Sequence, residues 1–337
     1  MNSVKRLIKN LLTVAVLTLV ASCGSGSSEK VESIEIDGSS TVYPITQEIV
    51  QQFKAANNPS EEITVSFSGT GGGFKKFCAG ETDINDASRP ISKNEMELCK
   101  QNEVFYIELP VAFDALTVAV NPQNTWASEI TVGELKKIWE PGSQRKVTKW
   151  NQVRPNWPDR PLNLYGPGTD SGTFDYFTEA IVGQAGASRS DYTASEDDEI
   201  LERGISSDVN ALGYFGFSYY EQNKNDLKSL AIDNGQGPVS PSVTAVENNQ
   251  YRPLARPLFI YVNAAQIRDN PLMADFLDFY LQNAAEVVGS VGYVPFDKDD
   301  YLVLYRNYHK TKVGTVFGGE SKFDLTIDEV LTRRAEF

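Results

Sequence analysis

Three segments of the chain share one pattern, in which a strand-like stretch ends in glycine and hydroxyl residues and a helix-like stretch follows at once. They are Asp37–Val42, Ser68–Gly73 and Gly168–Thr173. The unpaired N–H groups and the dipole of a helix N-terminus attract anions, and glycine lets a ligand approach the backbone closely. A single turn of this kind would be explained by helix capping, which uses the same residues. Three of them predict a site where neutral donors meet an oxyanion from several directions.

The stretches around the first two turns indicate the fold class. Ser33–Ile36 and Ile63–Phe67 alternate with period two, whereas Ile45, Ile49 and Phe53 recur at helical spacing between them. Strands that alternate with helices predict an α/β fold with mostly parallel sheets.

The middle of the chain continues this alternation. Thr131–Glu134 is a capping box that predicts a short helix through Trp139, and Leu162–Tyr165 is a predicted strand that runs into the third turn. The acidic run Glu196–Glu199 is interpreted as solvated surface without a functional role.

The N-terminus has the three parts of an export signal. Lys5, Arg6 and Lys9 precede the apolar run Leu11–Val20, and small residues lead to Cys23. A membrane anchor, the alternative, needs about 20 apolar residues, and this run is shorter. Removing the signal leaves about 310 residues, which is more than one hydrophobic core usually holds, so two domains are expected.

The end of this signal, Leu19–Cys23, resembles the bacterial lipobox, in which the cysteine thiol is acylated and the chain is cut just before it. The resemblance implies that residues 1–23 contain the signal peptide and that Cys23 becomes the lipidated first residue. Gly24–Ser28 is typical of a flexible linker, so residues 24–33 are predicted to be a tether.

The two remaining cysteines, Cys78 and Cys99, form an even pair in a chain predicted to be exported. In an oxidising compartment they suggest one disulfide, closing a loop of roughly 20 residues and worth about 3 kcal/mol on the chain-entropy model. Two free thiols are the alternative. The chain has a single histidine, His309, and no close Cys/His cluster, so neither a metal site nor a cofactor is expected.

The net charge of the chain indicates which kinds of molecule it can bind. The chain has 45 acidic and 31 basic residues, and the charges of the signal are all positive, so the mature chain is more acidic still. This balance argues against nucleic acid or an anionic membrane surface as the main partner. An anionic ligand must therefore be held by local dipoles against the overall field.

The third turn also invites an enzymatic interpretation, because Asp170–Thr173 superficially matches a serine-protease nucleophile turn and the aspartic-protease signature. A serine nucleophile needs a general base, and the only histidine lies in a polar stretch near the C-terminus. An aspartic dyad needs a second equivalent carboxylate, and the motif does not recur. We therefore expect no catalytic residues and no enzyme activity.

Four motifs in order carry a family resemblance: Gly38–Pro44, Ser68–Gly73, Asp86–Pro90 and Ser171–Thr173. Together they resemble the phosphate-binding components of ABC phosphate transporters, the PstS family. The resemblance covers nearly all of the mature chain and continues through residues 138–139, 149–151, 211–214 and 256–258.

The resemblance implies a type II periplasmic-binding-protein fold, with two α/β lobes that close on one phosphate ion. Two strands are expected to cross between the lobes, within residues 112–120 and 253–261. Lobe 1 would then contain residues 34–113 plus 255–337, and lobe 2 residues 114–254. The implied protein is a monomer in the periplasm or on the outer face of the cell membrane, delivering inorganic phosphate to ABC permease subunits.

The resemblance also implies ligand residues. Thr41 and the Val42 amide match the family's first contact, Thr70 falls where the second loop offers a hydroxyl, and Ser171–Thr173 match the loop that caps the anion from the other lobe. The full expected set is Ser40, Thr41, Val42, Ser68, Thr70, Ser88, Arg89, Asp170, Ser171, Gly172 and Thr173.

The chain departs from the family at the cationic ligand. Many relatives carry an arginine four residues before the serine of the third loop, where this chain has Pro167. Arg89 is the expected substitute, since a guanidinium can pair bidentately with two oxygens. The alternative is that Arg89 forms a surface or interlobe salt bridge.

A second departure concerns an acidic ligand. Relatives place an aspartate that accepts the proton of bound phosphate where direct alignment gives Ser88. A fixed carboxylate rejects sulfate, which carries no proton at neutral pH, by repulsion. Asp170 and Asp86 are the candidates, and Asp170 is favoured because it lies between expected ligand residues. A simple helix cap remains the alternative for Asp170.

Two other functions fit the same pattern. Another tetrahedral oxyanion, such as sulfate or molybdate, could occupy the site, and a phosphate sensor or adhesin could use the scaffold without transport. The sequence contains no motif that identifies a permease-facing surface.

Overall fold

The structure is a computed structural model that describes residues 32–57, 62–310, 312–322, 327–332 and 335–337. The predicted signal peptide, Cys23 and most of the predicted tether lie outside the described residues. Within the described ranges, no helix combines the length and apolar character that a membrane span requires.

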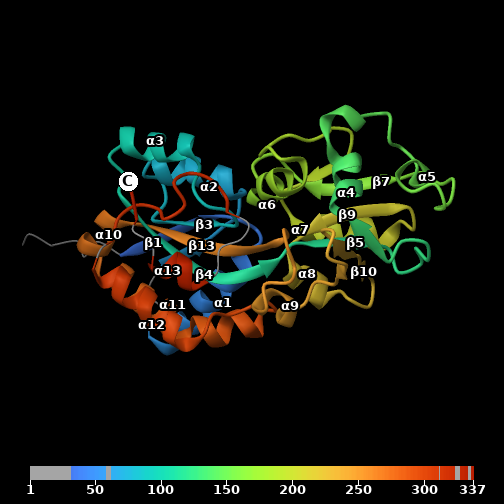
Figure 1. The fold of residues 1–337 in the computed structure, drawn as a ribbon. Helices are drawn as coiled ribbons and strands as arrows, with labels where there is room; N and C mark the ends of the chain where they lie inside the picture. The colour runs from blue at the N-terminus through green and yellow to red at the C-terminus, as the bar shows by residue number, and fades with distance from the viewer. Residues whose placement is uncertain (1–31, 58–61, 311, 323–326, 333–334) are drawn as a thin grey trace, which may run out of the picture. The chain divides into compact units, whose positions relative to one another are not determined.

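The first lobe is built on a five-stranded sheet in the order β2-β1-β3-β13-β4 (Figure 1). Its strands are β1 (Ser33–Gly38), β2 (Glu62–Val65), β3 (Ile84–Ala87), β4 (Tyr106–Ala115) and β13 (Ala255–Asn263). Strand β1 pairs in parallel with β2 and β3, whereas β13 runs antiparallel to both β3 and β4.

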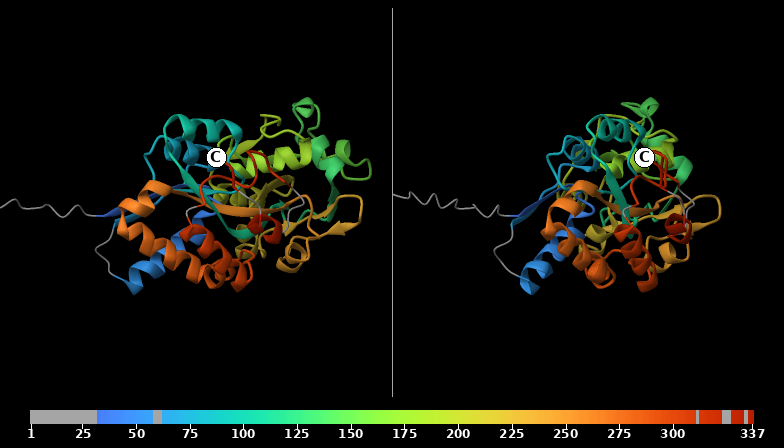
Figure 2. Two further views of the ribbon diagram at one scale, coloured as in Figure 1. Left: turned by 60° about the vertical axis from the view of Figure 1, so that its left-hand side comes forward. Right: turned by 90° about the vertical axis from the view of Figure 1, so that its left-hand side faces the viewer.

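Helices cover both faces of this sheet. They are α1 (Tyr43–Ala56), α2 (Thr70–Cys78), α3 (Lys93–Gln101), α10 (Ala264–Asp269), α11 (Pro271–Ser290), α12 (Lys298–His309) and α13 (Ile327–Thr332). Figures 1 and 2 show α2 and α3 on one face and α1, α11 and α12 on the other.

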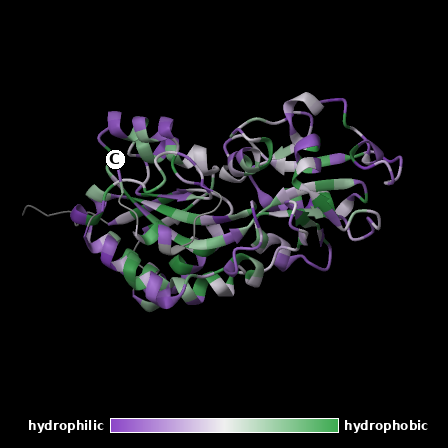
Figure 3. Ribbon diagram, in the orientation of Figure 1, coloured by the Kyte–Doolittle hydropathy of each residue, from purple (hydrophilic) through white to green (hydrophobic). Residues whose placement is uncertain are grey.

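Strand β13 explains how one sheet serves two cores. Successive side chains of a strand point to opposite faces. Leu258 and Ile260 accordingly pack in the core with α1 and α11, whereas Phe259 and Tyr261 pack in the core with α2 and α3. Figure 3 shows hydrophobic residues gathered in the strands and on the helix sides that face them.

The second lobe has a five-stranded sheet in the order β10-β5-β9-β7-β8 and a small sheet in the order β12-β11-β6. The strands are β5 (Thr117–Val120), β6 (Glu129–Thr131), β7 (Asn163–Pro167), β8 (Thr193–Ser195), β9 (Ala211–Phe215), β10 (Lys228–Ser229), β11 (Ala231–Asp233) and β12 (Pro238–Val239). The helices are α4 (Val132–Trp139), the 3-10 turn η1 (Pro141–Ser143), α5 (Trp150–Val153), α6 (Gly172–Phe177), the π-helical η2 (Thr178–Val182), α7 (Asp198–Ser207), α8 (Phe217–Gln222) and α9 (Val243–Glu247).

The prediction of mostly parallel sheets is therefore corrected. In each five-stranded sheet, two of the four strand pairings are parallel and two are antiparallel. The antiparallel pairings involve the strands next to the crossing between lobes, β4, β5 and β13. The chain leaves the first lobe along β4 and returns along β13, so these two neighbours run in opposite directions.

The crossing itself is short. Strand β4 ends at Ala115 and β5 begins at Thr117, with only Leu116 between the two sheets. The Leu116 amide donates to the Leu254 carbonyl at 2.8 Å, just before β13 begins. The predicted lobe boundaries, after residues 113 and 254, fall at this crossing and remain a prediction.

Two local predictions are confirmed. Cys78 at the end of α2 and Cys99 in α3 form a disulfide, and both cysteines are fully buried. Thr131 caps α4, with the Glu134 amide donating to its hydroxyl and its own amide donating to the Glu134 carboxylate.

Candidate functional site

The three turns predicted from the sequence each precede a helix, and the structure brings them together. Helices α1, α2 and α6 begin with Val42, Gly69 and Ser171 as their N-caps. The Gly71 amide donates to the Asp170 carbonyl at 2.9 Å, so the second and third turns touch across the lobes.

Hydroxyl groups from both lobes form a buried cluster at this point. The hydroxyl cluster comprises Thr41, Thr70, Ser88, Ser171 and Thr173. Thr41 and Thr173 lie 3.1 Å apart between their Oγ1 atoms, and the hydroxyls of Thr70 and Ser88 lie 3.3 Å apart. The Thr173 amide donates to the Ser171 hydroxyl at 3.1 Å.

Gly172 connects the two halves of the hydroxyl cluster. A Cβ atom at this position would lie 2.4 Å from Thr70 Oγ1 and 2.7 Å from Ser88 Oγ, closer than any side chain tolerates. Glycine is therefore required for the N-terminus of α6 to approach the hydroxyls of the first lobe.

A buried arginine supplies positive charge to the cluster. Arg256 has no exposed surface and lies opposite Asp114 in the pairing of β13 with β4. It donates to Asp114 Oδ2 at 2.8 and 3.1 Å, to the Ser88 carbonyl at 3.1 Å and to Thr173 Oγ1 at 2.9 Å. A buried charge destabilises the fold unless it is paired and hydrogen-bonded. The position of Arg256 beside neutral hydroxyl groups therefore suggests a role in binding an anion.

Arg89, the arginine expected to replace the family's cation, has other partners. Its guanidinium donates twice to Glu95 at 2.8 Å and once to Asp175 at 2.7 Å, and also to the Pro90 carbonyl. Asp175 belongs to α6 in the second lobe, so the structure shows the interlobe salt bridge that was the alternative for Arg89. No hydrogen bond between Arg89 and the hydroxyl cluster occurs among the described residues.

Neither predicted carboxylate bonds to the hydroxyl cluster in the described part of the chain. Asp170 pairs with Lys75 at 2.7 Å, and its side chain is 48% exposed. Asp86 is fully buried and accepts from the Thr46 hydroxyl at 3.0 Å, on the side of the sheet that α1 covers. Burial raises the pKa of Asp86 well above its ordinary value, opposed by the Thr46 hydrogen bond.

A different carboxylate lies beside the first turn. Asp198, the first residue of α7, is 2% exposed and accepts from the Ser40 hydroxyl at 3.2 Å. Burial raises its pKa to about 7, although the positive charge of Arg256 and the Ser40 hydrogen bond oppose the shift. The interpretation of residues 196–199 as solvated surface is thus wrong for Asp198, because α7 turns this side chain toward the first lobe.

Two other expected ligand residues are engaged locally. The Val42 amide donates to the Ser39 carbonyl at 3.2 Å, within the first turn. The Ser68 hydroxyl donates to Asp37 Oδ1 at 3.0 Å, away from the hydroxyl cluster. No group of His, Cys, Asp or Glu side chains arranged to hold a metal occurs in the described ranges.

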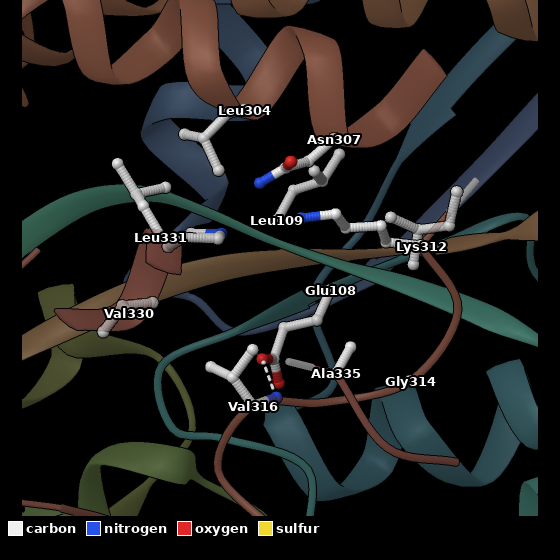
Figure 4. Close-up of a pocket in the computed structure, with 12 residues that line it drawn as sticks. Glu108, Leu109, Leu304, Asn307, Lys312, Gly314, Val316, Val330, Leu331 and Ala335 are labelled. Carbon is white, nitrogen blue, oxygen red and sulfur yellow. Dashed lines mark hydrogen bonds between the residues drawn. The ribbon is translucent and has the colours of Figure 1, made fainter. Parts of the chain in front are cut away.

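A separate small pocket lies at the edge of the first sheet. Its volume is about 40 Å³, and Figure 4 shows Glu108 in its lining, with the Val316 amide donating to the carboxylate. Glu108 also accepts from the hydroxyls of Tyr261 and Thr315 at 2.6 and 2.5 Å. Burial raises the pKa of Glu108 to about 6 against these hydrogen bonds. The carboxylate therefore fastens the C-terminal segment to β4 and β13.

Comparison with known proteins identifies the class. Residues 24–284 match the PBP superfamily domain. Protein SphX of Synechocystis sp. is 56% identical over the whole of both chains, and the phosphate-binding protein PstS of Staphylococcus saprophyticus is 32% identical over 91% of this chain and 93% of its own. The chain therefore belongs to the PBP superfamily, in the family of PstS-type phosphate-binding proteins.

Solved structures agree on the fold. A possible phosphate binding protein from Planctomyces limnophilus has 43% sequence identity and a TM-score of 0.62, covering 83% of this chain and 98% of its own. A putative phosphate ABC transporter substrate-binding protein from Clostridium perfringens, solved with bound phosphate, has a TM-score of 0.66 at 23% identity, over 79% of this chain and all of its own. Both support the two-lobed fold.

Proposed function

We propose that the chain is an extracytoplasmic solute-binding protein, which captures inorganic phosphate between its lobes and delivers it to an ABC-type importer. It acts as a monomer without catalytic activity, held at the membrane by a lipid on Cys23. The family membership supports the ligand and the transport role, and the hydroxyl cluster around Arg256 is the observation that carries the proposal for this chain.

The donors of the hydroxyl cluster suit a tetrahedral oxyanion. Thr41, Thr70 and Ser88 come from the first lobe, and Ser171 and Thr173 from the second. Each hydroxyl can rotate its hydrogen toward an anion. Donors from both lobes link binding to lobe closure, because neither lobe alone supplies the full set.

Arg256 provides the charge that these neutral donors lack. Its partner Asp114 holds the guanidinium on the crossing strands, and the guanidinium's other donors point to the hydroxyl cluster and the Ser88 carbonyl. The Arg256 donor that reaches Thr173 lies at the boundary between the two halves of the cluster. We therefore assign to Arg256 the cationic role that the sequence suggested for Arg89.

The direct test is calorimetric titration of the chain lacking residues 1–23 with phosphate, arsenate, sulfate and molybdate. We expect phosphate to bind at micromolar concentration or tighter and sulfate much more weakly. Preferential binding of sulfate or molybdate would overturn the ligand assignment and leave the fold unaffected.

Membrane attachment has its own test. In cells fed a labelled fatty acid, the native chain should carry the label and Cys23→Ala should not. A matched control is Ser22→Ala, which changes the neighbouring residue but keeps the thiol. Equal labelling of the native chain and Cys23→Ala would remove the lipid anchor from the proposal.

A further inference from the structure

We propose that residues 314–321, which follow α12, form a strap that fastens the first lobe to the second and slows the release of bound phosphate. This segment, called the C-terminal strap below, lies beyond residue 284, where the match to the PBP superfamily domain ends. The inference rests on the proposed function and adds to it a device that controls the rate of ligand exchange.

The beginning of the C-terminal strap is fixed to strand β4 of the first lobe. The Gly314 amide donates to the Tyr106 carbonyl at 2.9 Å. The Glu108 carboxylate accepts from the Thr315 hydroxyl at 2.5 Å and from the Val316 amide at 3.0 Å, the second of which Figure 4 shows. Because Thr315 is also buried, this end of the strap must move with the first lobe.

The middle of the C-terminal strap packs on the helices α2 and α3. Phe317 is 2% exposed, and its ring centroid lies 5.3 Å from that of Phe259 in the core that these helices cover. Gly319 has a positive φ of 82°, and a Cβ atom there would lie 2.6 Å from Lys93 Cγ at the start of α3. The next residue, Glu320, forms an ion pair with Lys93. These contacts determine the path of the strap along the first lobe.

The far end of the C-terminal strap contacts the second lobe. The Ser321 hydroxyl donates a hydrogen bond to the carboxylate of Glu179 on η2. Burial raises the pKa of Glu179 above its ordinary value, and this hydrogen bond opposes the shift. Glu179 follows Asp175 by about one helical turn, and Asp175 pairs with Arg89 across the lobes. The strap therefore adds a contact between the lobes beside the Arg89 ion pair.

This arrangement favours the closed form of the protein. The strap is already held by the first lobe, so forming the bond between Ser321 and Glu179 orders few additional groups and costs little conformational entropy. The bond joins the two lobes, so it must break when they separate. A contact that forms only on closure stabilises the complex after the ligand has entered, and its loss changes dissociation more than association.

The first test is the rate at which the mature chain, loaded with labelled phosphate, exchanges it for unlabelled phosphate. Ser321→Ala and Glu179→Ala should each release phosphate about threefold faster, with the association rate unchanged within about twofold. The double variant should be no faster than the faster single variant, because both changes remove the same hydrogen bond. Ser290→Ala is the matched control and should release at the native rate, since its hydroxyl donates to the Val287 carbonyl at 2.8 Å within the first lobe.

A second variant loosens the strap without changing the bond itself. Phe317→Ala removes the ring that holds the strap on the core, so we expect release to accelerate by about threefold or more, and Ser321→Ala added to it should have no further effect. Thermal melting shows whether Phe317→Ala keeps its fold, and the cycle between Ser321 and Glu179 tests the strap independently of that variant.

Native release rates in both Ser321→Ala and Glu179→Ala overturn the inference, and so does a double variant in which the two accelerations multiply. A native chain that binds no phosphate rejects the proposed function itself.

Discussion

Two buried arginines, Arg89 and Arg256, contact both lobes, but they differ in the charge of their hydrogen-bond partners. Arg89 is 8% exposed and lies between two carboxylates, Glu95 in its own lobe and Asp175 in the other. Arg256 is fully buried with one carboxylate partner, Asp114, and its remaining donors meet neutral oxygens. Arg89 thus has two carboxylate partners for one positive charge, whereas Arg256 has a single hydrogen-bonded carboxylate partner. A buried arginine therefore indicates an anion site only where the carboxylates bonded to it do not outnumber its single positive charge.

The largest expected effect follows from removing the second arginine. Arg256→Gln should weaken phosphate binding about a hundredfold or more, because the cluster loses its cation and Asp114 is left buried and unpaired. The unpaired Asp114 carboxylate would also destabilise the fold. The variant to test is therefore Arg256→Gln combined with Asp114→Asn, which removes both charges. A double variant that melts like the native chain and still binds phosphate at native affinity would contradict the role of Arg256.

A smaller loss is expected from removing one hydroxyl beside Arg256. Thr173→Val should weaken phosphate binding by about tenfold, the cost of one charge-assisted hydrogen bond in a buried site. Thr117→Val is the matched control, because Thr117 is equally buried and its hydroxyl donates to the Ala115 carbonyl at 2.9 Å, away from the hydroxyl cluster. Calorimetry should separate the two variants, and equal losses would show that buried hydroxyls matter here only for stability.

The Arg89 group should instead affect the rate of ligand release. Asp175→Asn breaks the ion pair between lobes, so we expect the closed form to open about five times faster with little change in the association rate. Trp139 lies in the core of the second lobe, and stopped-flow tryptophan fluorescence can follow the opening. Glu95→Gln is the control, since Glu95 pairs with Arg89 within one lobe. If both variants release phosphate at the native rate, the Arg89 group does not hold the lobes together.

Local patterns made much of this architecture predictable. The capping box at Thr131, the disulfide between Cys78 and Cys99, and the strand, turn and helix order around the hydroxyl cluster all depend on residues near in sequence. The antiparallel pairing of β4 with β13 was missed, because it depends on where the chain crosses between the lobes.

The charged residues of the site were beyond sequence reasoning for a physical reason. Arg256 and Asp114 are 142 residues apart and meet only through the register of two crossing strands. Asp198 belongs to a run of four acidic residues that reads as surface, and only the packing of α7 and α8 against the first turn buries it. The sequence signal that pointed to Arg256 was a single arginine at the start of a long, mostly apolar strand, β13.

The smallest effect is expected at the second ion pair between the lobes, Lys75 with Asp170. Both side chains are about half exposed or more, at 67% and 48%, and exposed pairs contribute at most about 1 kcal/mol. Asp170→Asn should therefore change phosphate affinity less than about threefold, and only at low salt, where screening is weak. Lys75→Gln should behave alike, because it breaks the same pair from the other lobe. Titrations at low and high salt test this, and a salt-independent loss in Asp170→Asn alone would return this aspartate to the ligand site.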